Sequence, residues 1–188
     1  MMSSNLLPLK EQFELHLHHK YNFNFADVAR AFFNKYNDEN RLCMTTIAHM
    51  KQLDEDRFEI VRRMENVMSS KPLYERIIFN RSSKQVQGFT FEKECDNVYV
   101  EHYVYREDTK DSNNTVYDMF LYKNPGLQKF LRFKLHNWGV QTMTNMIKKD
   151  MEMRAMLREQ TEKLKEAKDK LQAKVVEKLH LSNDNTSS

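Results

Sequence analysis

The 188-residue chain is poor in cysteine, glycine and proline, with 2, 3 and 3 residues of these types. Cys43 and Cys95 allow at most one bridge and lie in no C-x-x-C pair, so a disulfide framework, a structural zinc site and thioredoxin-type chemistry have no support. Gly88, Gly126 and Gly139 stand alone, which argues against the glycine-rich phosphate loops of nucleotide-binding enzymes. We therefore expect neither a disulfide-rich protein nor an enzyme of those nucleotide-handling kinds.

Long apolar runs are also missing. No stretch approaches the roughly 20 apolar residues that a membrane span requires, and residues 1–12 lack both the apolar run of a secretory signal and the arginines of a transit peptide. We expect a soluble or peripheral protein with no readable cleaved address. Apolar residues still make up 40% of the chain, including 12 Phe, 12 Met and 8 Tyr, so global disorder is excluded.

Neither sign of charge dominates, since the chain has 30 basic and 27 acidic residues and a formal net charge of +3. The basic excess lies at one end: residues 126–188 hold 13 Lys and Arg against 8 Asp and Glu. Lys and Glu are interleaved there rather than grouped in a dense basic stripe. We therefore expect no nucleic-acid partner.

The first third of the chain changes its apolar period once. Apolar residues alternate from Phe13 to Phe23, which predicts a strand with one solvent-facing side. From Phe25 to Tyr36 they recur at helical spacing, and Asn24 is placed to cap the first turn. Residues 44–50 and 58–61 then predict a hairpin that turns on the acidic residues 54–56, and residues 64–72 are a connection.

The middle of the chain predicts an antiparallel meander. Four strand candidates rich in Phe, Tyr, Val and Ile are separated by polar turns such as 80–83 and 110–114. These candidates are Arg76–Asn80, Gln85–Glu94, Val98–Arg106 and Thr115–Lys123. After the turn signal at Asn124, Pro125 and Gly126, apolar residues from Leu127 to Met151 recur at helical spacing and predict a long C-terminal helix.

This order of elements predicts an α+β helix-grip fold, in which a curved antiparallel sheet of six or seven strands wraps a long C-terminal helix. START-like lipid carriers share that order. A sheet and helix so arranged enclose a space that either a packed core or an acyl chain can fill. Methionines 143, 146, 151, 153 and 156 suit an irregular apolar tunnel and an ordinary core alike, and the core is the better-favoured interpretation.

Residues with catalytic or metal-binding potential form no convincing set. His16 and His18 would project from one face of the first strand beside His19, but a metal needs three or four converging ligands and no second cluster is visible. A polar sheet face is the favoured interpretation. No G-x-S-x-G motif is present, and no nucleophile–base pair can be assembled from readable motifs. We expect no metal site and no catalysis.

The C-terminal helix carries two candidate binding features. Asn145 and Lys148, spaced i to i+3, place an amide beside an ammonium and could cradle one phosphate group. Leu157, Leu164 and Leu171 repeat every seven residues, with Val175 at the next four-residue step.

The leucine repeat predicts a narrow seam that binds a partner protein. The alternative is a solvated helix held by i to i+4 charge pairs. We accordingly divide the chain into an N-terminal extension (1–12), a helix-grip domain (13–156) and an extended basic helix with a polar tail (157–188).

The arrangement over residues 13–156 resembles the PRELI family of mitochondrial intermembrane-space proteins, which are START-like carriers of acidic phospholipids. The opening helix ends in Lys35-Tyr36-Asn37, where the family shows a K-Y-P-N-P-like stretch. The residues that carry the rest of the resemblance are Arg62-Arg63, Phe89-Thr90-Phe91 followed by residues 99–105, and Asn145-Met146-Ile147-Lys148, which matches the family's S-N-x-x-K segment. The chain departs from the family in lacking the proline after Tyr36, in having Thr144 in place of the serine, and in its short connection from Met64 to Tyr74, where the family has a lid.

The resemblance implies a non-catalytic mitochondrial protein that binds or transfers an acidic phospholipid. It implies headgroup contacts from Asn145, Lys148, Lys149 and Lys35, and no cofactor other than a bound phospholipid. It also implies contact with a membrane surface, a small twin-cysteine helical partner, and a location in the intermembrane space or peripheral to the inner membrane. The alternative function is a structural accessory subunit of a mitochondrial inner-membrane complex that has lost lipid transfer and docks through its C-terminal helix.

Overall fold

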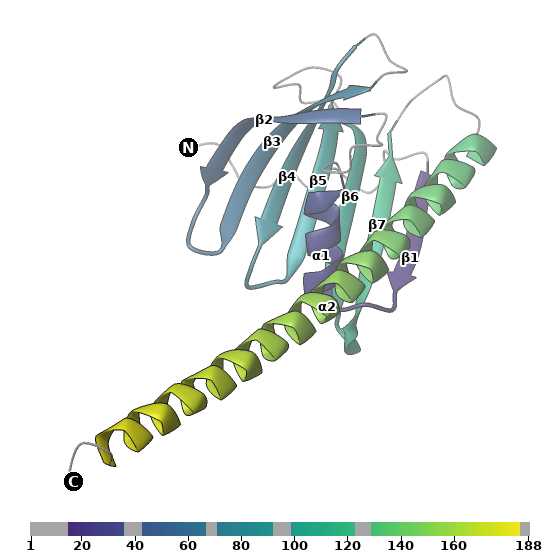
Figure 1. Ribbon diagram of the computed structural model, residues 1–188. Coiled ribbons are helices and arrows are strands. Elements are labelled where there is room, and N and C mark those ends of the chain that lie inside the picture. Colours follow the sequence, from purple (N-terminus) through teal and green to yellow (C-terminus); the bar gives the residue numbers. More distant parts are fainter. Residues whose placement is uncertain (1–14, 36–42, 67–70, 92–98, 123–128, 185–188) are drawn as a thin grey trace. The chain divides into compact units, whose positions relative to one another are not determined.

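The computed structural model describes residues 15–35, 43–66, 71–91, 99–122 and 129–184 (Figure 1). One short helix interrupts a series of seven strands, and one long helix follows them. The elements in chain order are β1 (Leu15–Tyr21), α1 (Phe25–Asn34), β2 (Cys43–Gln52), β3 (Arg57–Asn66), β4 (Leu73–Asn80), β5 (Gln85–Phe91), β6 (Tyr99–Asp108), β7 (Asp111–Leu121) and α2 (Lys129–Asp184).

The strands form one antiparallel sheet in the order β1-β7-β6-β5-β4-β3-β2. Each strand from β2 to β7 pairs with its neighbour in sequence, so β2 and β3 form the predicted hairpin and β4 to β7 form the predicted meander. Strand β1 pairs with β7. The sequence-based expectation of an α+β fold with an antiparallel sheet and a long C-terminal helix is therefore confirmed.

Helix α1 begins where the sequence indicates. Asn24 is its N-cap, and the side-chain oxygen of Asn24 accepts a hydrogen bond of 3.0 Å from the backbone N–H of Asp27. That bond satisfies one of the backbone donors that the first turn leaves without an intrahelical partner. The apolar stripe of the helix is buried, with Val28 and Phe32 fully removed from solvent.

The core lies on one face of the sheet, which we call the inner face. In Figure 1, α1 lies in front of β5 and β6 on that side. The buried apolar cluster joins α1 to strand residues such as Ile77, Val86 and Tyr117, and to Met143 and Ile147 of α2. Residues that lie directly opposite each other in a ladder project to the same face, so the register assigns every strand residue to the inner or the outer face.

Several strand ends differ from the sequence-based expectation. β4 begins at Leu73 instead of Arg76, because Leu73 pairs with Met64. β3 runs to Asn66 and so extends into the expected connection. β7 begins at Asp111, within the expected turn 110–114. An antiparallel partner that runs alongside extends a strand through polar residues that have no strand preference of their own. The predicted ends at Phe13, Lys123 and Leu127 and the connection at 67–70 lie outside the described residues.

Helix α2 spans two units of the chain, which divides into residues 1–147 and 148–188. In the first unit Met143 and Ile147 are buried. In the second unit, exposed Glu and Lys residues surround three exposed leucines. None of the helices in the described ranges has a stretch apolar enough to cross a membrane.

Candidate functional site

A row of three residues crosses β2, β3 and β4 on the inner face. Ile47 lies opposite Arg62, and Arg62 lies opposite Glu75. The neighbouring row contains Met50, Ile60 and Ile77. Because Ile77 belongs to the buried core, both rows face the same side as the core. A charged pair is thus placed within an apolar surface.

Glu75 is the centre of a buried polar cluster. Its Oε2 accepts a hydrogen bond from Arg62 Nε at 2.9 Å and lies 2.6 Å from Arg62 Nη2. Its Oε1 accepts one hydrogen bond from Lys35 Nζ at 3.1 Å and another from the hydroxyl of Tyr103. Glu75 is 1% exposed and Arg62 is 6% exposed, so water contributes little to this arrangement.

Both cations also pack on one aromatic ring of α1. Lys35 follows the last helical residue, and its backbone N–H bonds to the carbonyl of Phe32. Its ammonium lies 4.2 Å from the centroid of the Phe32 ring, and the guanidinium carbon of Arg62 lies 5.3 Å from the same centroid. A desolvated ring face attracts cations, so Phe32 helps to hold both of them beside Glu75.

Tyr103 reaches Glu75 across a glycine. Gly88 lies opposite Tyr103 in the β5–β6 ladder, and the phenol ring occupies the space that a Cβ at residue 88 would need. A side chain at Gly88 would displace the ring from its bond to Glu75. Gly88 is therefore required for the geometry of the cluster.

The carboxyl of Glu75 stays ionised despite its burial. Burial raises its pKa, but the charges of Lys35 and Arg62 and the hydrogen bonds from Tyr103 and Lys35 outweigh that effect, and the net pKa is lowered from 4.5. The cluster then contains two cations and one carboxylate, a formal charge of +1. Its electrostatic contribution to stability is present above pH 4.5 and is lost as the pH falls through the lowered pKa.

An exposed apolar strip adjoins the charged cluster. Ile47 is 65% exposed and Met50 is 66% exposed, although both project from the inner face. Phe58 and Ile60 of β3 continue the strip and are partly buried. The inner face of β2 and β3 is thus open beside Arg62, whereas that of β5 to β7 is filled by the core. An open apolar surface next to a buried cationic cluster can hold an anionic amphiphile.

The predicted headgroup residues lie in different surroundings. Lys35 is bound to Glu75 within the cluster, with a side chain 19% exposed. Asn145 is exposed on the part of α2 that belongs to residues 1–147. Lys148 and Lys149 are exposed in the second unit. The structure thus places Lys35 on the inner face, and a joint headgroup site of all four residues stays a prediction.

The predicted seam residues lie in the second unit. Leu157, Leu164 and Leu171 are 55%, 71% and 65% exposed, and the side chain of Val175 lies outside the described residues. Of the helix methionines, Met143 is buried, whereas Met151, Met153 and Met156 are exposed.

The histidines of β1 form a polar outer face. His16 Nε2 and His18 Nδ1 lie 2.9 Å and 2.8 Å from one carboxylate oxygen of Asp118, and Arg106 donates to the other oxygen at 3.0 Å. The expected projection of both histidines from one face is confirmed. Across the ranges that the structure describes, no group of three or more His, Cys, Asp or Glu side chains is arranged to hold a metal ion.

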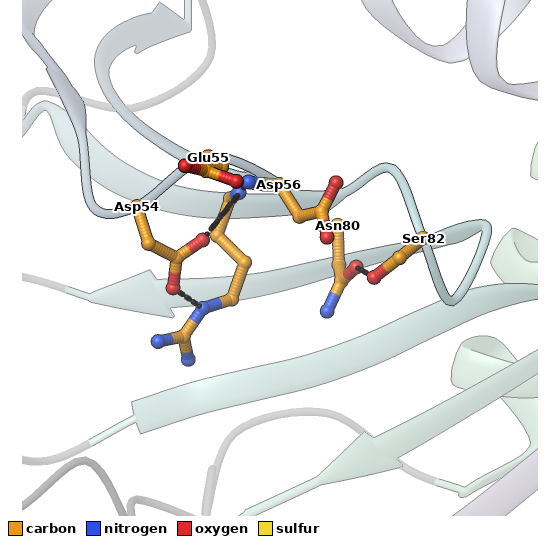
Figure 2. A pocket seen from close by; sticks show the side chains of 6 residues that line it. Asp54, Glu55, Asp56, Asn80 and Ser82 are labelled. Carbon is orange, nitrogen blue, oxygen red and sulfur yellow. Dashed lines mark hydrogen bonds and ion pairs between the residues drawn. The ribbon is translucent and has the colours of Figure 1, made fainter.

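The acidic turn between β2 and β3 lines a second, polar depression (Figure 2). Asp54 accepts hydrogen bonds from the backbone N–H groups of Asp56 and Arg57 and from Arg57 Nε at 2.6 Å. These bonds explain why the pKa of Asp54 is lowered. The Asp54 side chain closes the hairpin, and we assign this turn a structural role.

The sequence analysis named Arg62 only among the residues that carry the family resemblance. It did not identify Glu75, Tyr103, Ile47 or Met50 as site residues. A signal was available in the strand periodicity. Arg62 falls in phase with Ile60 and Met64, and Glu75 falls in phase with Ile77 and Phe79. A charged residue on the apolar phase of a strand indicates a buried charge, which needs a partner.

The comparison with known proteins identifies the fold. No protein-family model and no curated protein sequence matches the chain. Among solved structures, the chain is similar to the Zhui aromatase/cyclase from Streptomyces sp. R1128, with 12% identity, 75% of this chain and 95% of that chain covered, and a TM-score of 0.50.

Two further solved structures are similar at lower scores. A protein of Thermus thermophilus is 11% identical over 72% of this chain and 94% of that chain, with a TM-score of 0.47. A protein of Bacillus thuringiensis is 12% identical over 71% of this chain and 97% of that chain, with a TM-score of 0.42. The seven-stranded antiparallel sheet and the long C-terminal helix, together with the Streptomyces match, show that the chain has a helix-grip, START-like fold.

Proposed function

We propose that this protein is a non-catalytic, PRELI-like protein that binds an acidic phospholipid on the inner face of its sheet and transfers it between membranes. The observation that supports this most directly is the position of Ile47. Its side chain is two-thirds exposed and lies opposite the buried Arg62. One ligand with an acyl chain and an anionic headgroup would satisfy both features.

The apolar strip supplies the hydrophobic part of the binding energy. Full burial of an Ile or Met side chain contributes about 1.5–3 kcal/mol. Ile47 and Met50 each have about two-thirds of that surface still exposed, so an acyl chain that covered both would gain about 2–4 kcal/mol from them. Lys35 and Arg62 supply the charge complementarity, because ammonium and guanidinium groups are the usual partners of phosphate in proteins.

The chemistry of the cluster favours binding over catalysis. A general acid needs a carboxyl whose pKa lies near the working pH, but the pKa of Glu75 is lowered and its carboxylate is held by two cations. Glu75 therefore holds the cationic groups in place. Turnover of a phospholipid ester by the purified protein would overturn this part of the proposal.

The test compares two faces of the same strand. We would measure co-flotation with phosphatidylcholine vesicles that contain phosphatidic acid, using the double variant Ile47→Asn and Met50→Asn. The matched control is Thr46→Asn and His49→Asn, because these two exposed residues pair with Arg63 and Val61 on the outer face.

We expect the inner-face variant to lose at least tenfold in affinity and the outer-face control to bind like the wild type. Glu75→Gln keeps an amide oxygen that can accept from Lys35 or Arg62 but removes the charge that competes for them, so it should bind phosphatidic acid more tightly. Equal binding by the inner-face and outer-face variants would refute the proposed site. Vesicles without an anionic lipid would show whether the headgroup charge matters.

The location follows from the same resemblance. We propose that the protein lies in the mitochondrial intermembrane space or at the surface of the inner membrane, with a small twin-cysteine helical protein as its partner. Fractionation that placed it in the cytosol or the matrix would contradict this.

A second candidate function is an accessory subunit of a mitochondrial inner-membrane complex. The observation in its favour is the exposure of Leu157, Leu164 and Leu171 at seven-residue spacing in the second unit. We would purify the protein from detergent-solubilised membranes and analyse lipids and proteins by mass spectrometry. Recovery in a large complex that is lost on truncation after Met156 would support the subunit. Recovery with a phospholipid and no stoichiometric partner would support the carrier.

A further inference from the structure

A further depression runs along α1 from its N-cap to Phe33. It encloses about 710 Å³, within the range of small-molecule sites. One wall is α1 from its N-cap to Phe33, and the other walls are the end of β4 with the β4–β5 turn, the end of β6 and the start of β7. The lining residues are Asn24, Phe25, Ala26, Ala29, Arg30, Phe33, Phe79, Arg81, Lys84, Glu107, Ser112 and Asn113. We call it the α1 groove.

The α1 groove combines an aromatic floor with a basic rim. Phe79 stacks with Phe25 at a centroid distance of 6.3 Å and meets Phe33 edge-on at 6.2 Å. Three cationic residues, Arg30, Arg81 and Lys84, line the groove with one carboxylate, Glu107. A site of this kind is complementary to a molecule that joins an apolar body to an anionic head.

The backbone at Lys84 is an independent indication of a functional role. Lys84 has a φ of +45°, and in the described ranges it is the one non-glycine residue with positive φ. Gly or Asn is favoured at such a hairpin position. A strained residue of this type is found disproportionately at ligand-binding positions.

The ion pair of Lys84 gives a weak structural reason for the strain. Its Nζ lies 2.7 Å and 2.9 Å from the two carboxylate oxygens of Glu107, but the Lys84 side chain is 54% exposed. Exposed ion pairs contribute little to stability. The turn also uses this backbone conformation, since the Lys84 N–H bonds to the Arg81 carbonyl and the Lys84 carbonyl accepts from the Glu107 N–H. The conformation places the Lys84 ammonium, paired with Glu107, on the wall of the groove.

We propose that the α1 groove binds a small amphiphilic anion, of which a medium-chain carboxylate is the simplest example. The apolar body would lie on Phe25, Phe33 and Phe79, and the carboxylate would face Arg81 and Lys84. This groove adjoins the apolar strip on β2 and β3, since Phe58 of the strip lies opposite Phe79 and beneath Arg81. The two sites share no lining residue, and this proposal does not depend on the phospholipid site.

The test uses decanoate as the probe and two-dimensional amide NMR of the full chain as the readout. We expect decanoate to shift the amide signals of Ala26, Ala29 and Arg81. Decanol, which has the same chain without the charge, should shift them at least tenfold more weakly at equal concentration. Absence of these shifts up to the solubility limit, or equal shifts with decanol, would overturn the proposal.

Two variants separate binding from folding. Ala26→Trp should fill the groove and abolish the shifts, because Ala26 is exposed and lines it. Ala155→Trp, at an exposed helical position outside the groove, is the matched control. Lys84→Gly should bind decanoate at least tenfold more weakly while its thermal midpoint stays the same or rises. Wild-type binding by both groove variants would overturn the proposal.

The variant Ile47→Asn with Met50→Asn distinguishes the two sites. If the α1 groove binds decanoate, the shifts at Ala26 and Arg81 persist in this variant, whether or not phospholipid binding is lost. Loss of those shifts in this variant, together with persistence of the Arg81 shift in Ala26→Trp, would refute the groove.

Discussion

Replacing Gly88 by alanine is the sharpest available test of the buried cluster. The added methyl group would occupy the position of the Tyr103 ring. That ring is 4% exposed and is packed against Phe32 and Tyr105 at centroid distances of 5.6 Å and 5.8 Å. It therefore cannot move without disturbing the core or leaving Glu75.

The expected cost is the sum of two effects. Overpacking of a well-filled core typically costs about 1–3 kcal/mol. Loss of the hydrogen bond from Tyr103 to the ionised Glu75 costs about 1.5–3 kcal/mol more. We expect Gly88→Ala to lower the free energy of unfolding by about 2.5–6 kcal/mol, as measured by urea denaturation with fluorescence detection.

Gly139 provides the matched control. It lies in α2, and a Cβ built there meets nothing within 4 Å. Because alanine is a better helix former than glycine by about 0.8–1 kcal/mol, Gly139→Ala should raise the stability by about that amount. The double variant Gly88→Ala with Tyr103→Ala should be about as stable as Tyr103→Ala alone. Additive effects of the two substitutions, or a cost below about 1 kcal/mol for Gly88→Ala, would refute the reasoning.

Two predictions concern pH. Burial lowers the pKa of His102 from 6.5 to about 4. The folded protein therefore loses no stability from His102 above pH 6.5, where the imidazole is neutral, and it loses roughly 3 kcal/mol as the pH falls from 6.5 toward 4. His102 lies between Phe89 and Phe120, and His102→Phe should make the urea midpoint depend less on pH between pH 4 and 6.5. An unchanged pH dependence of the midpoint would exclude His102 as the source of that dependence. Burial also raises the pKa of Tyr21 and Tyr105 well above 10, so at least two of the eight tyrosines should show no tyrosinate absorbance at pH 11 until the protein unfolds. Full ionisation in the folded state would contradict their burial.

The fold was predictable because its elements follow local rules. The change from alternation to helical spacing at Phe25, the cap at Asn24 and the turn at residues 54–56 each specify an element through neighbours in sequence. The ends of β3, β4 and β7 were predicted less well. They depend on the partner strand, which local sequence does not contain.

The candidate site was less predictable because it joins distant residues. Lys35 and Glu75 are 40 positions apart, and Glu75 and Tyr103 are 28 positions apart. Only the register brings Ile47, Arg62 and Glu75 into one row. Periodicity indicates that a charge is buried, but it does not indicate which partner the charge meets. The α1 groove was missed for the same reason, since its walls come from a helix, the β4–β5 turn and the ends of β4, β6 and β7.

A variant that replaces the whole cluster separates a binding role from a purely structural one. Replacing a buried ion pair by well-packed apolar residues is often neutral or stabilising by about 1–4 kcal/mol, whereas removing one partner costs about 3–5 kcal/mol. We therefore expect Arg62→Met alone to destabilise the protein by the latter amount. The combined variant Lys35→Met, Arg62→Met, Glu75→Leu and Tyr103→Phe should be at least as stable as the wild type.

That combined variant should nevertheless fail to bind vesicles that contain phosphatidic acid, because it keeps the apolar strip at Ile47 and Met50 but removes both cations. Urea denaturation and vesicle flotation on the same preparation would measure the two properties together. A purely structural role also allows the combined variant to be as stable as the wild type, but it predicts that this variant binds vesicles like the wild type. The flotation assay therefore decides between the two roles, and urea denaturation of the same preparation shows that the variant is folded.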